Sequence, residues 1–373
     1  MLTLDDILLR DRFKRFGEEA VDVAIMEAGL GAARDATNAL DPSSLDLGVL
    51  TSIGSEHVKA LGGSVESIAK AKAAVLKEGK VGVIGEQGDG AAEAVVLLEA
   101  SERRVKTYRV EAVVRYHLED ERAHLEEDSG KVVVKNTVSF QVPGELASAC
   151  FGAVDTCEIH DPWEFDASLS LVGKHQASNA ATAIASALSL KADSGYDRIS
   201  MESIRAGLEA ATLPGRFQVT DDVFLDERMK KRVLTIVDGA HTEASAKCLA
   251  DTVRQLFPDS KLVVVMAMAS DKDHVGFCSE IQKAHPNVVV FTETPIAGGH
   301  VRSAGPGALV GAWQVARMKN RDVGRTWRCR ELIQANVQSA LAKARHELSG
   351  ESSTMGSPGI ILVCGSLSTC NAV

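Results

Sequence analysis

The sequence predicts an α/β protein built on mostly parallel sheets, and three observations support this prediction. Short apolar runs rich in β-branched residues recur without polar alternation, as expected of strands that are buried on both faces. Each run ends abruptly in glycine and polar residues. Helical patterns follow these ends, and this β-loop-α order is typical of open parallel sheets.

Four strands are expected to end at a polar cluster, at residues 21–26, 47–53, 233–237 and 262–269. Their clusters are Glu27-Ala28-Gly29, Gly54-Ser55-Glu56-His57, Asp238-Gly239-Ala240-His241 and Ser270-Asp271-Lys272-Asp273. Helices are expected over residues 64–77, 243–257 and 273–284. Because open parallel sheets bind ligands at the carboxyl ends of their strands, all four clusters lie where a site is expected.

The chain has 373 residues, which at about 150 residues per domain indicates about two domains. Residues 104–170 carry several short β-type runs and a plausible hairpin turn at 128–131, which predict an antiparallel β-rich insertion. An alanine-rich helix is expected over residues 174–190, and Pro214-Gly215 marks a boundary. We therefore expect a first domain over residues 1–218 and a second over 219–373, which ends with a strand at 360–364 and folds by itself.

Composition excludes several classes of protein. The net charge of −10 argues against a general nucleic-acid binder, which would show a basic stripe. The longest apolar run, residues 262–269, is far shorter than the roughly 20 residues of a membrane helix. Seven cysteines without a C-x-x-C pair are typical of reduced thiols, and the first 20 residues predict an amphipathic helix rather than a signal peptide. We expect an intracellular protein, in the cytoplasm or an organelle such as the mitochondrion, that binds neither nucleic acid nor membrane; its oligomeric state stays open.

Lys72 stands out from the pattern of the helix predicted over residues 64–77. It lies inside the apolar stripe formed by Val65, Ile68, Ala69, Val75 and Leu76. A charged amine at that place is costly unless it is paired, reaches solvent along its own stem, or is chemically modified. The sequence leaves these alternatives open.

Two carboxylates end apolar runs, and one helix carries a polar stripe. Glu27 can hold a hard cation or cap the next turn, and Asp238 before a glycine suits a ribose or a phosphate-bound water. His175, Asn179 and Thr182 share one helical face, which either meets solvent or a ligand. The opposite, packing side is formed by Ala177, Ala180, Ala181, Ile184 and Leu188.

Eight motifs in a fixed order resemble those of a known family. They are Glu27-Ala28-Gly29-Leu30-Gly31 with Asp35-Ala36-Thr37-Asn38, Thr51-Ser52-Ile53-Gly54-Ser55-Glu56-His57, Ile68-Ala69-Lys70-Ala71-Lys72, Gly173-Lys174-His175-Gln176-Ala177-Ser178-Asn179, Pro214-Gly215-Arg216, Asp238-Gly239-Ala240-His241, Asp271-Lys272-Asp273 and Gly365-Ser366. With these motifs in this order, the chain resembles the folylpolyglutamate synthase and dihydrofolate synthase family of the Mur-ligase superfamily. Within that family, its motif residues are most similar to those of plant-type dihydrofolate synthases.

The resemblance implies a fold and a reaction. It implies a Mur-ligase-like central α/β domain that is truncated at its N-terminus, followed by a Rossmann-like C-terminal domain. The implied activity is an ATP-dependent ligation of L-glutamate to a dihydropteroate or folate carboxylate, in folate and one-carbon metabolism. The carboxylate takes the γ-phosphoryl group of ATP to form an acyl phosphate, and the glutamate amine then displaces phosphate. The implied cofactors are ATP and Mg²⁺.

The resemblance also implies roles for single residues. Glu27 and His57 match magnesium ligands, although magnesium usually prefers oxygen, and the alternative for His57 is a hydrogen-bonded loop histidine. Lys72 matches a lysine that is carbamylated, which turns a cation into an anion facing the metal; Lys72 and His57 are therefore the expected catalytic residues. Asn179 matches a residue near the adenine. The residues that match a clamp on ATP from the second domain are Arg216, Asp238 and His241.

The chain departs from the family in one major respect. Family members carry a strand and a Gly-Lys-Ser/Thr phosphate loop before the strand that ends at Glu27, and no G-x-x-x-x-G-K occurs in this sequence. Smaller departures are Ala32 for glycine, Glu56 for aspartate and Thr242-Glu243 for Asn-Pro. We therefore expect no measurable ligase activity from the chain as printed. The alternatives are an inactive homologue that binds nucleotide or folate weakly, and a dehydrogenase, which the lack of G-x-G-x-x-G after a strand disfavours.

Overall fold

The computed structural model describes residues 13–29, 31–54, 61, 63–125, 132–152, 161–225, 230–296, 299, 302–320, 327–349 and 357–373. By their contacts, the residues group into two compact units. Unit 1 is formed by Met1–His117, Ser139–Asp166 and Ala177–Ala206, and unit 2 by Leu118–Val138, Ala167–Gln176 and Gly207–Val373. These units differ from the ranges 1–218 and 219–373, because part of the β-rich region and the residues just before 219 group with unit 2.

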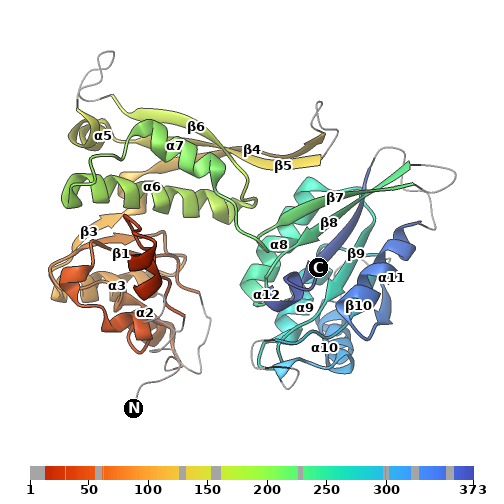
Figure 1. The fold of residues 1–373 in the computed structure, drawn as a ribbon. Helices are drawn as coiled ribbons and strands as arrows, with labels where there is room; N and C mark the ends of the chain where they lie inside the picture. Colours follow the sequence, from red (N-terminus) through yellow and green to blue (C-terminus); the bar gives the residue numbers. More distant parts are fainter. Residues whose placement is uncertain are drawn as a thin grey trace. The chain divides into compact units, whose positions relative to one another are not determined.

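The sheet of unit 2 has six strands (Figure 1). In spatial order they are β11 (Arg330–Ile333), β10 (Val288–Phe291), β9 (Leu262–Met266), β12 (Gly359–Cys364), β8 (Lys230–Val237) and β7 (Gln218–Leu225). Neighbouring strands are parallel throughout, except that β7 runs antiparallel to β8. The predicted parallel architecture is confirmed, as is a strand at residues 233–237, whereas the strand predicted over 262–269 ends earlier, at Met266.

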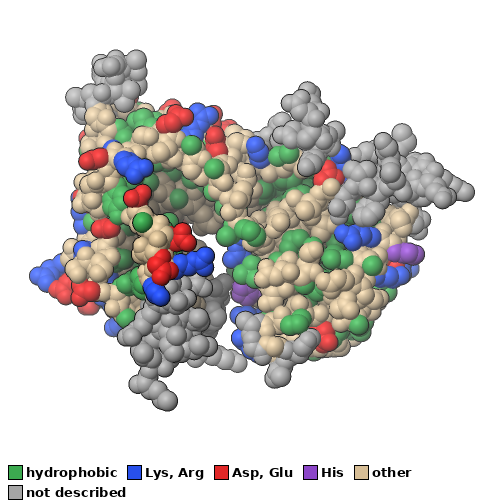
Figure 2. Space-filling model, viewed as in Figure 1, with side chains coloured by type: hydrophobic (Ala, Val, Ile, Leu, Met, Phe, Trp, Pro, Cys, Tyr) green, Lys and Arg blue, Asp and Glu red, His purple; other side chains and the backbone are tan. Residues whose placement is uncertain are grey.

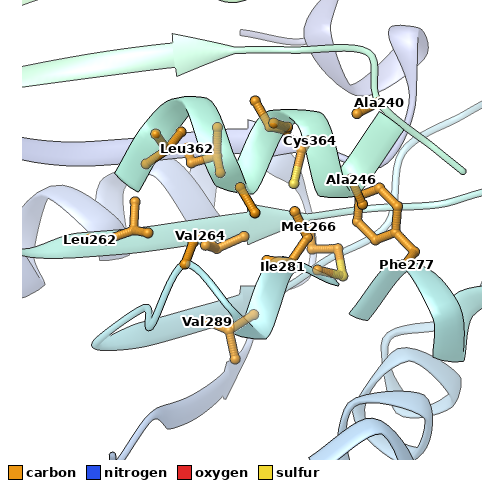
Figure 3. Packing of buried hydrophobic residues seen from close by; sticks show 14 of the residues in the cluster. Ala240, Ala246, Leu262, Val264, Met266, Phe277, Ile281, Val289, Leu362 and Cys364 are labelled. Atoms are coloured by element: carbon orange, nitrogen blue, oxygen red, sulfur yellow. The ribbon is translucent and has the colours of Figure 1, made fainter. Parts of the chain in front are cut away.

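Helices cover both faces of this sheet, which explains why its strands do not alternate apolar and polar residues. One face packs against α8 (Glu243–Leu256), α9 (His274–Gln282) and α10 (Pro306–Lys319), and the other against α11 (Val337–Ser349). Figure 3 shows Val264 and Met266 of β9 pointing toward Phe277 and Ile281 of α9 within this core. A last short helix, α12 (Leu367–Cys370), follows β12.

Unit 1 contains a smaller parallel sheet. Its strands, in order, are β1 (Leu47–Leu50), β2 (Val81–Ile84) and β3 (Lys106–Arg109). α2 (Val65–Ala73) and α3 (Gly90–Glu102) pack together with the ends of β1 and β2 in one apolar cluster. Further elements of this region are the 3-10 helices η1 (Ala36–Ala39) and η2 (Pro42–Ser44), and the helices α4 (Val110–Val113), α6 (Lys174–Ser194) and α7 (Met201–Ala210). The packing side predicted for α6 is confirmed, since Ala177, Ala180, Ala181, Ile184 and Leu188 are all buried.

The β-rich region forms a third sheet whose strands contribute residues to both units. Its strand order is β4 (Arg115–Leu125), β5 (Val132–Val142) and β6 (Trp163–Leu169), with α5 (Gly144–Phe151) between the last two in sequence. The runs predicted at 113–118 and 123–125 lie largely in the single strand β4, because the polar residues between them continue the strand. The hairpin turn predicted at 128–131 lies outside the described residues.

The strand predicted over residues 21–26 is wrong. These residues have no regular secondary structure, and Ile25 is 92% exposed. In the strand order of this sheet β1 is terminal, and within the described part of the chain no strand pairs with its outer edge. An apolar run becomes a strand only where a neighbouring strand satisfies its backbone, and composition alone does not reveal that neighbour.

The surface carries charges of both signs. On the face drawn in Figure 2, acidic and basic side chains are mixed over unit 1 rather than separated into patches. None of the helices in the described ranges is both long enough and apolar enough to cross a bilayer.

Candidate functional site

The carboxyl end of β8 carries Asp238, whose carboxylate is anchored by the backbone. Its Oδ2 accepts a hydrogen bond from the Phe217 N–H at 2.8 Å, and its Oδ1 accepts one from the Ala240 N–H at 2.8 Å. Burial raises the pKa of Asp238, while these two hydrogen bonds and the Arg216 charge oppose the rise. The carboxylate is thus desolvated and fixed, and it holds the residue that follows Arg216.

Arg216 lies against the turn that follows Asp238. The Gly239 N–H donates to the Gly215 carbonyl at 2.8 Å, which joins the two segments. A Cβ atom on Gly239 would lie 3.1 Å from Nη1 of Arg216 and would clash with the Leu367 side chain. Only glycine leaves room for a guanidinium and a leucine to approach the backbone so closely.

His175 joins these residues within unit 2. Burial lowers its pKa from the ordinary value, the Asp238 charge opposes this, and the Arg216 charge lowers it further. Part of the ring is exposed, yet the protein atoms around it desolvate the imidazolium. The sequence placed His175 in a polar stripe with Asn179, and both residues are exposed; the structure also brings His175 into the electrostatic range of Arg216 and Asp238.

His241 is held in a defined orientation at the start of α8. Its Nδ1 lies 2.9 Å from the Gly239 carbonyl oxygen, and because a carbonyl only accepts, Nδ1 carries a proton; in the neutral ring Nε2 is then an acceptor. The His241 N–H donates to Oγ of Ser245 at 3.1 Å. Thr242 and Ser245 form a capping box, so the Thr242-Glu243 departure still begins the helix.

A cavity of about 400 Å³ lies beside Arg216 in unit 2. It is lined by residues 132–135, 170–171, 212–214 and 216–219. Among the described residues that line it, Lys135 and Arg216 are the charged ones, and none is a carboxylate. A volume in the lower part of the roughly 300–1,000 Å³ range of ligand sites, with two cations, favours a small anionic ligand.

In unit 1, a tripeptide that the sequence analysis did not single out joins two predicted site segments. Gly85-Glu86-Gln87 follows β2 directly. Oε1 of Gln87 accepts from the Ile53 N–H at 3.0 Å, and its Nε2 donates to the Thr51 and Gly85 carbonyls. Glu86 contacts Ser178 of α6 through a hydrogen bond of 3.2 Å. The signal was present in the sequence, since glycine and polar residues follow an apolar run here as at the other strand ends.

Comparison with known proteins identifies the group to which the chain is similar. A family model of the Mur ligase middle domain matches residues 2–187, and one of the Mur ligase, glutamate ligase domain matches residues 215–367. A dihydrofolate synthase/folylpolyglutamate synthase of Bacillus subtilis is 31% identical over 278 residues, covering 74% of this chain and 55% of that protein. The chain belongs to the folylpolyglutamate synthase and dihydrofolate synthase family of Mur ligases.

Two solved structures of the same family share this fold. A folylpolyglutamate synthase of Mycobacterium tuberculosis complexed with ADP and AMPPCP has a TM-score of 0.72 at 24% identity, over 100% of this chain and 72% of that one. A bifunctional folylpolyglutamate synthase/dihydrofolate synthase of Yersinia pestis complexed with AMPPNP and Mn ion has a TM-score of 0.65 at 25% identity, over 99% and 70%. The chain spans about half the length of the curated relatives it matches.

In this Mur ligase chain, the loop that follows Glu27 lies against the end of α2. Oδ2 of Asp35 accepts from the Gly29 N–H at 2.8 Å, and its Oδ1 accepts from the N–H and hydroxyl of Thr37. The Ala33 N–H donates to the Ala71 carbonyl at 3.0 Å, next to Lys72. The Asp35-Ala36-Thr37-Asn38 motif thus folds the loop, and the Glu27 side chain is exposed.

Of the residues expected to hold a metal, the structure describes Glu27 and Lys72. Lys72 lies half-buried in the last turn of α2, where no described residue pairs with it, whereas Lys70 is exposed and pairs with Glu99 at 3.3 Å. His57 lies outside the described residues. In the described ranges no three His, Cys, Asp or Glu side chains are grouped so that they could hold a metal ion.

The polar stripe predicted on α6 is only partly confirmed. Asn179 is exposed, as expected, but Thr182 is only 6% exposed. Its hydroxyl donates to the Ser178 carbonyl at 2.9 Å. A threonine that bonds back to its own helix can be buried at little cost, so the prediction that Thr182 lies on a polar face was wrong.

Proposed function

We propose that this chain serves the ATP-dependent addition of L-glutamate to a dihydropteroate or folate carboxylate. The observation that carries the proposal is the cluster of Arg216, Asp238 and His175 at the carboxyl end of β8, where an open parallel sheet binds its ligands. The family to which the chain belongs supports the reaction class.

Within this proposal, the residues of unit 2 bind the nucleotide. Arg216 offers a guanidinium to a phosphate, and its backbone is held by the anchored carboxylate of Asp238. Asp238 keeps unused acceptor capacity for a ribose hydroxyl or a phosphate-bound water. Nε2 of His241 offers a further acceptor at the same turn. Asn179 of α6 is proposed as a contact to the adenine.

The proposed chemistry balances in two steps. The substrate carboxylate attacks the γ-phosphorus of ATP, and ADP leaves with the electron pair of the broken P–O bond. The glutamate amine then attacks the acyl carbon, loses a proton and expels phosphate. The protein's contribution is positioning and charge neutralisation. A magnesium ion would add positive charge at the phosphates, and Glu27, His57 and a carbamylated Lys72 are the residues proposed to hold it.

A second candidate function is binding of a nucleotide or folate without catalysis. The observation that favours it is that the contacts described around Arg216, Asp238 and His241 concern binding of a nucleotide rather than transfer of its phosphate. The expectation of no measurable ligase activity for the chain as printed stays a prediction.

One experiment tests the binding proposal. ATP affinity is measured by calorimetry for the parent chain, Arg216→Ala, Asp238→Ala and the control Arg198→Ala, whose side chain is 92% exposed. Loss of a charge-assisted contact of roughly 1.5–3 kcal/mol should weaken ATP binding about tenfold or more in Arg216→Ala. Equal affinities in Arg216→Ala and Arg198→Ala would overturn the proposal.

A second measurement decides between the two candidates. Phosphate release is followed with ATP, Mg²⁺, L-glutamate and either dihydropteroate or tetrahydrofolate. Release that requires the pteridine substrate and is lost in Glu27→Ala supports the ligase. ATP binding that depends on Arg216, without release above a blank, supports the binding protein.

A further inference from the structure

Glu86 joins two elements at the carboxyl end of β2 inside unit 1. Its Oε2 accepts a hydrogen bond from the Tyr116 hydroxyl at 2.6 Å, at the start of β4. The same oxygen accepts from Oγ of Ser178 at 3.2 Å, in the second turn of α6. One carboxylate oxygen therefore ties β2 to both the strand and the helix.

The helix is seated closely on the strand ends beside this carboxylate. A Cβ atom on Gly85 would lie 3.2 Å from the Leu50 carbonyl oxygen and 3.3 Å from Oγ1 of Thr182. Both distances are tighter than ordinary van der Waals contact. Thr182 of α6 therefore lies close to the backbone at the end of β2, and a side chain larger than that of glycine at position 85 would crowd it.

Tyr116 keeps its proton under all ordinary conditions. Burial, followed by the hydrogen bond to Glu86, raises the pKa of Tyr116 to about 12. The phenol therefore remains a donor to Glu86 across the physiological range.

We propose that Glu86, held by Tyr116, is a positioning residue for the nucleotide site. By binding Ser178 it fixes the rotation of α6, and the next residue, Asn179, then presents its amide in one direction. This inference rests on the proposed function, in which Asn179 contacts the nucleotide. Glu86 itself touches no ligand in this proposal; it acts through the helix.

Three substitutions distinguish the hydrogen bonds that Glu86 accepts from its negative charge. Glu86→Ala removes the acceptor, and Tyr116→Phe removes one donor while keeping the ring. Glu86→Gln keeps an oxygen that can accept from both hydroxyls. We expect ATP affinity to fall about tenfold in Glu86→Ala and severalfold in Tyr116→Phe. Glu86→Gln should restore most of the affinity that alanine loses.

Tyr196→Phe is the matched control, because it removes a comparable 2.7 Å hydrogen bond, to Asp46, in the same unit. All affinities are measured well below the melting temperature of each variant, so that lost folding does not register as lost binding. A loss of ATP affinity in Glu86→Ala that is no larger than the loss in Tyr196→Phe would overturn the inference.

A double-mutant cycle tests whether Glu86 and Tyr116 act through Asn179. In an Asn179→Ala background, Tyr116→Phe should change ATP affinity less than twofold further. If Asn179→Ala weakens binding and the effect of Tyr116→Phe adds in full, the positioning inference fails while the nucleotide contact stands. If Asn179→Ala has no effect, the contact proposed for Asn179 and the inference built on it both fail.

Discussion

Asp238 has a structural task that precedes any contact with a ligand. Both of its oxygens accept backbone hydrogen bonds, and the donors come from Phe217 and Ala240. The residue before Phe217 is Arg216, so the carboxylate fixes the backbone that carries the guanidinium. The Asp238 side chain thus fixes the backbone next to Arg216, and the spacing of the two motifs in the sequence does not show this link.

His175 should give the protein part of its sensitivity to acid. Its pKa lies below the ordinary value of 6.5, so below that pH the unfolded chain binds a proton that the folded chain does not. The stability is present above pH 6.5 and is lost as the pH falls through this value toward the folded pKa. We expect the melting temperature of His175→Gln to fall less than that of the parent between about pH 7.5 and 5.5.

The effect of His175→Gln should be modest, because part of the ring is exposed and the pKa of His285 is also lowered. Melting temperatures measured above pH 7 provide the internal control, because there they should change with pH in the same way for the parent and for His175→Gln. Curves that stay parallel through the acid range would contradict the assignment.

Lys72 and Lys70 offer a matched pair of substitutions in one helix. Arginine keeps the positive charge in both but cannot form a carbamate. We expect Lys72→Arg to weaken the magnesium-dependent part of ATP binding severalfold and Lys70→Arg to leave it unchanged, because Lys70 is exposed and pairs with Glu99. ATP titrations with and without Mg²⁺ measure the difference. Equal responses of the two variants would remove the functional assignment of Lys72.

At the scale of elements, the sequence predicts strands well where both faces are covered. β8, β9 and β12 were predicted from apolar runs without polar alternation, which burial on both faces favours. The same reasoning failed at residues 21–26, where no described strand provides a partner. Composition reports what a segment can bury, not whether a neighbour is there to cover it.

The candidate site was predictable in part for the same reason. Asp238 and His241 were found because they follow a strand directly, and sequence order carries that information. The link from Glu86 to Tyr116 was missed because it joins residues 30 positions apart through side chains alone. Such a contact depends on how strands and helices pack, which no local pattern records.

The N-terminal cap of α8 should contribute to the stability of the protein next to His241. Thr242 accepts from the Ser245 N–H at 3.2 Å, and the Ser245 hydroxyl in turn accepts from the N–H groups of Thr242 and His241. Thr242→Ala should lower the free energy of unfolding by about 1 kcal/mol, the usual value of an N-cap. Thr242→Ser keeps the hydroxyl and should lose little. Urea unfolding measures both, and equal losses would show that the cap contributes nothing.

At the scale of the whole molecule, the two compact units are not divided at the boundary that the sequence predicted. Pro214-Gly215 lies inside unit 2, and Phe217, just before the expected second domain, is only 5% exposed in its core. Val134, from the β-rich region, and Val172, just after it, pack into the same core. A fold built from three segments of the chain cannot be divided by one cut without exposing apolar surface.

Two fragments test this division. The fragment of residues 207–373 keeps Phe217 and the bond from Gly239 to Gly215, whereas the fragment of residues 219–373 lacks both. Losing a buried phenylalanine typically destabilises by roughly 3–5 kcal/mol, so the longer fragment should have the higher urea midpoint. Both lack Val134 and Val172, which makes them comparable. A midpoint of the shorter fragment that equals or exceeds that of the longer one would contradict the prediction.

β12 begins at Gly359 of a 373-residue chain, yet it is hydrogen-bonded between β8 and β9. During synthesis both neighbours leave the ribosome long before the strand that belongs between them. They face each other across a gap one strand wide, with unpaired backbone on both sides. This sheet can therefore close only after its last strand has been synthesised, and until then the half-made protein presents the kind of open edge that molecular chaperones bind.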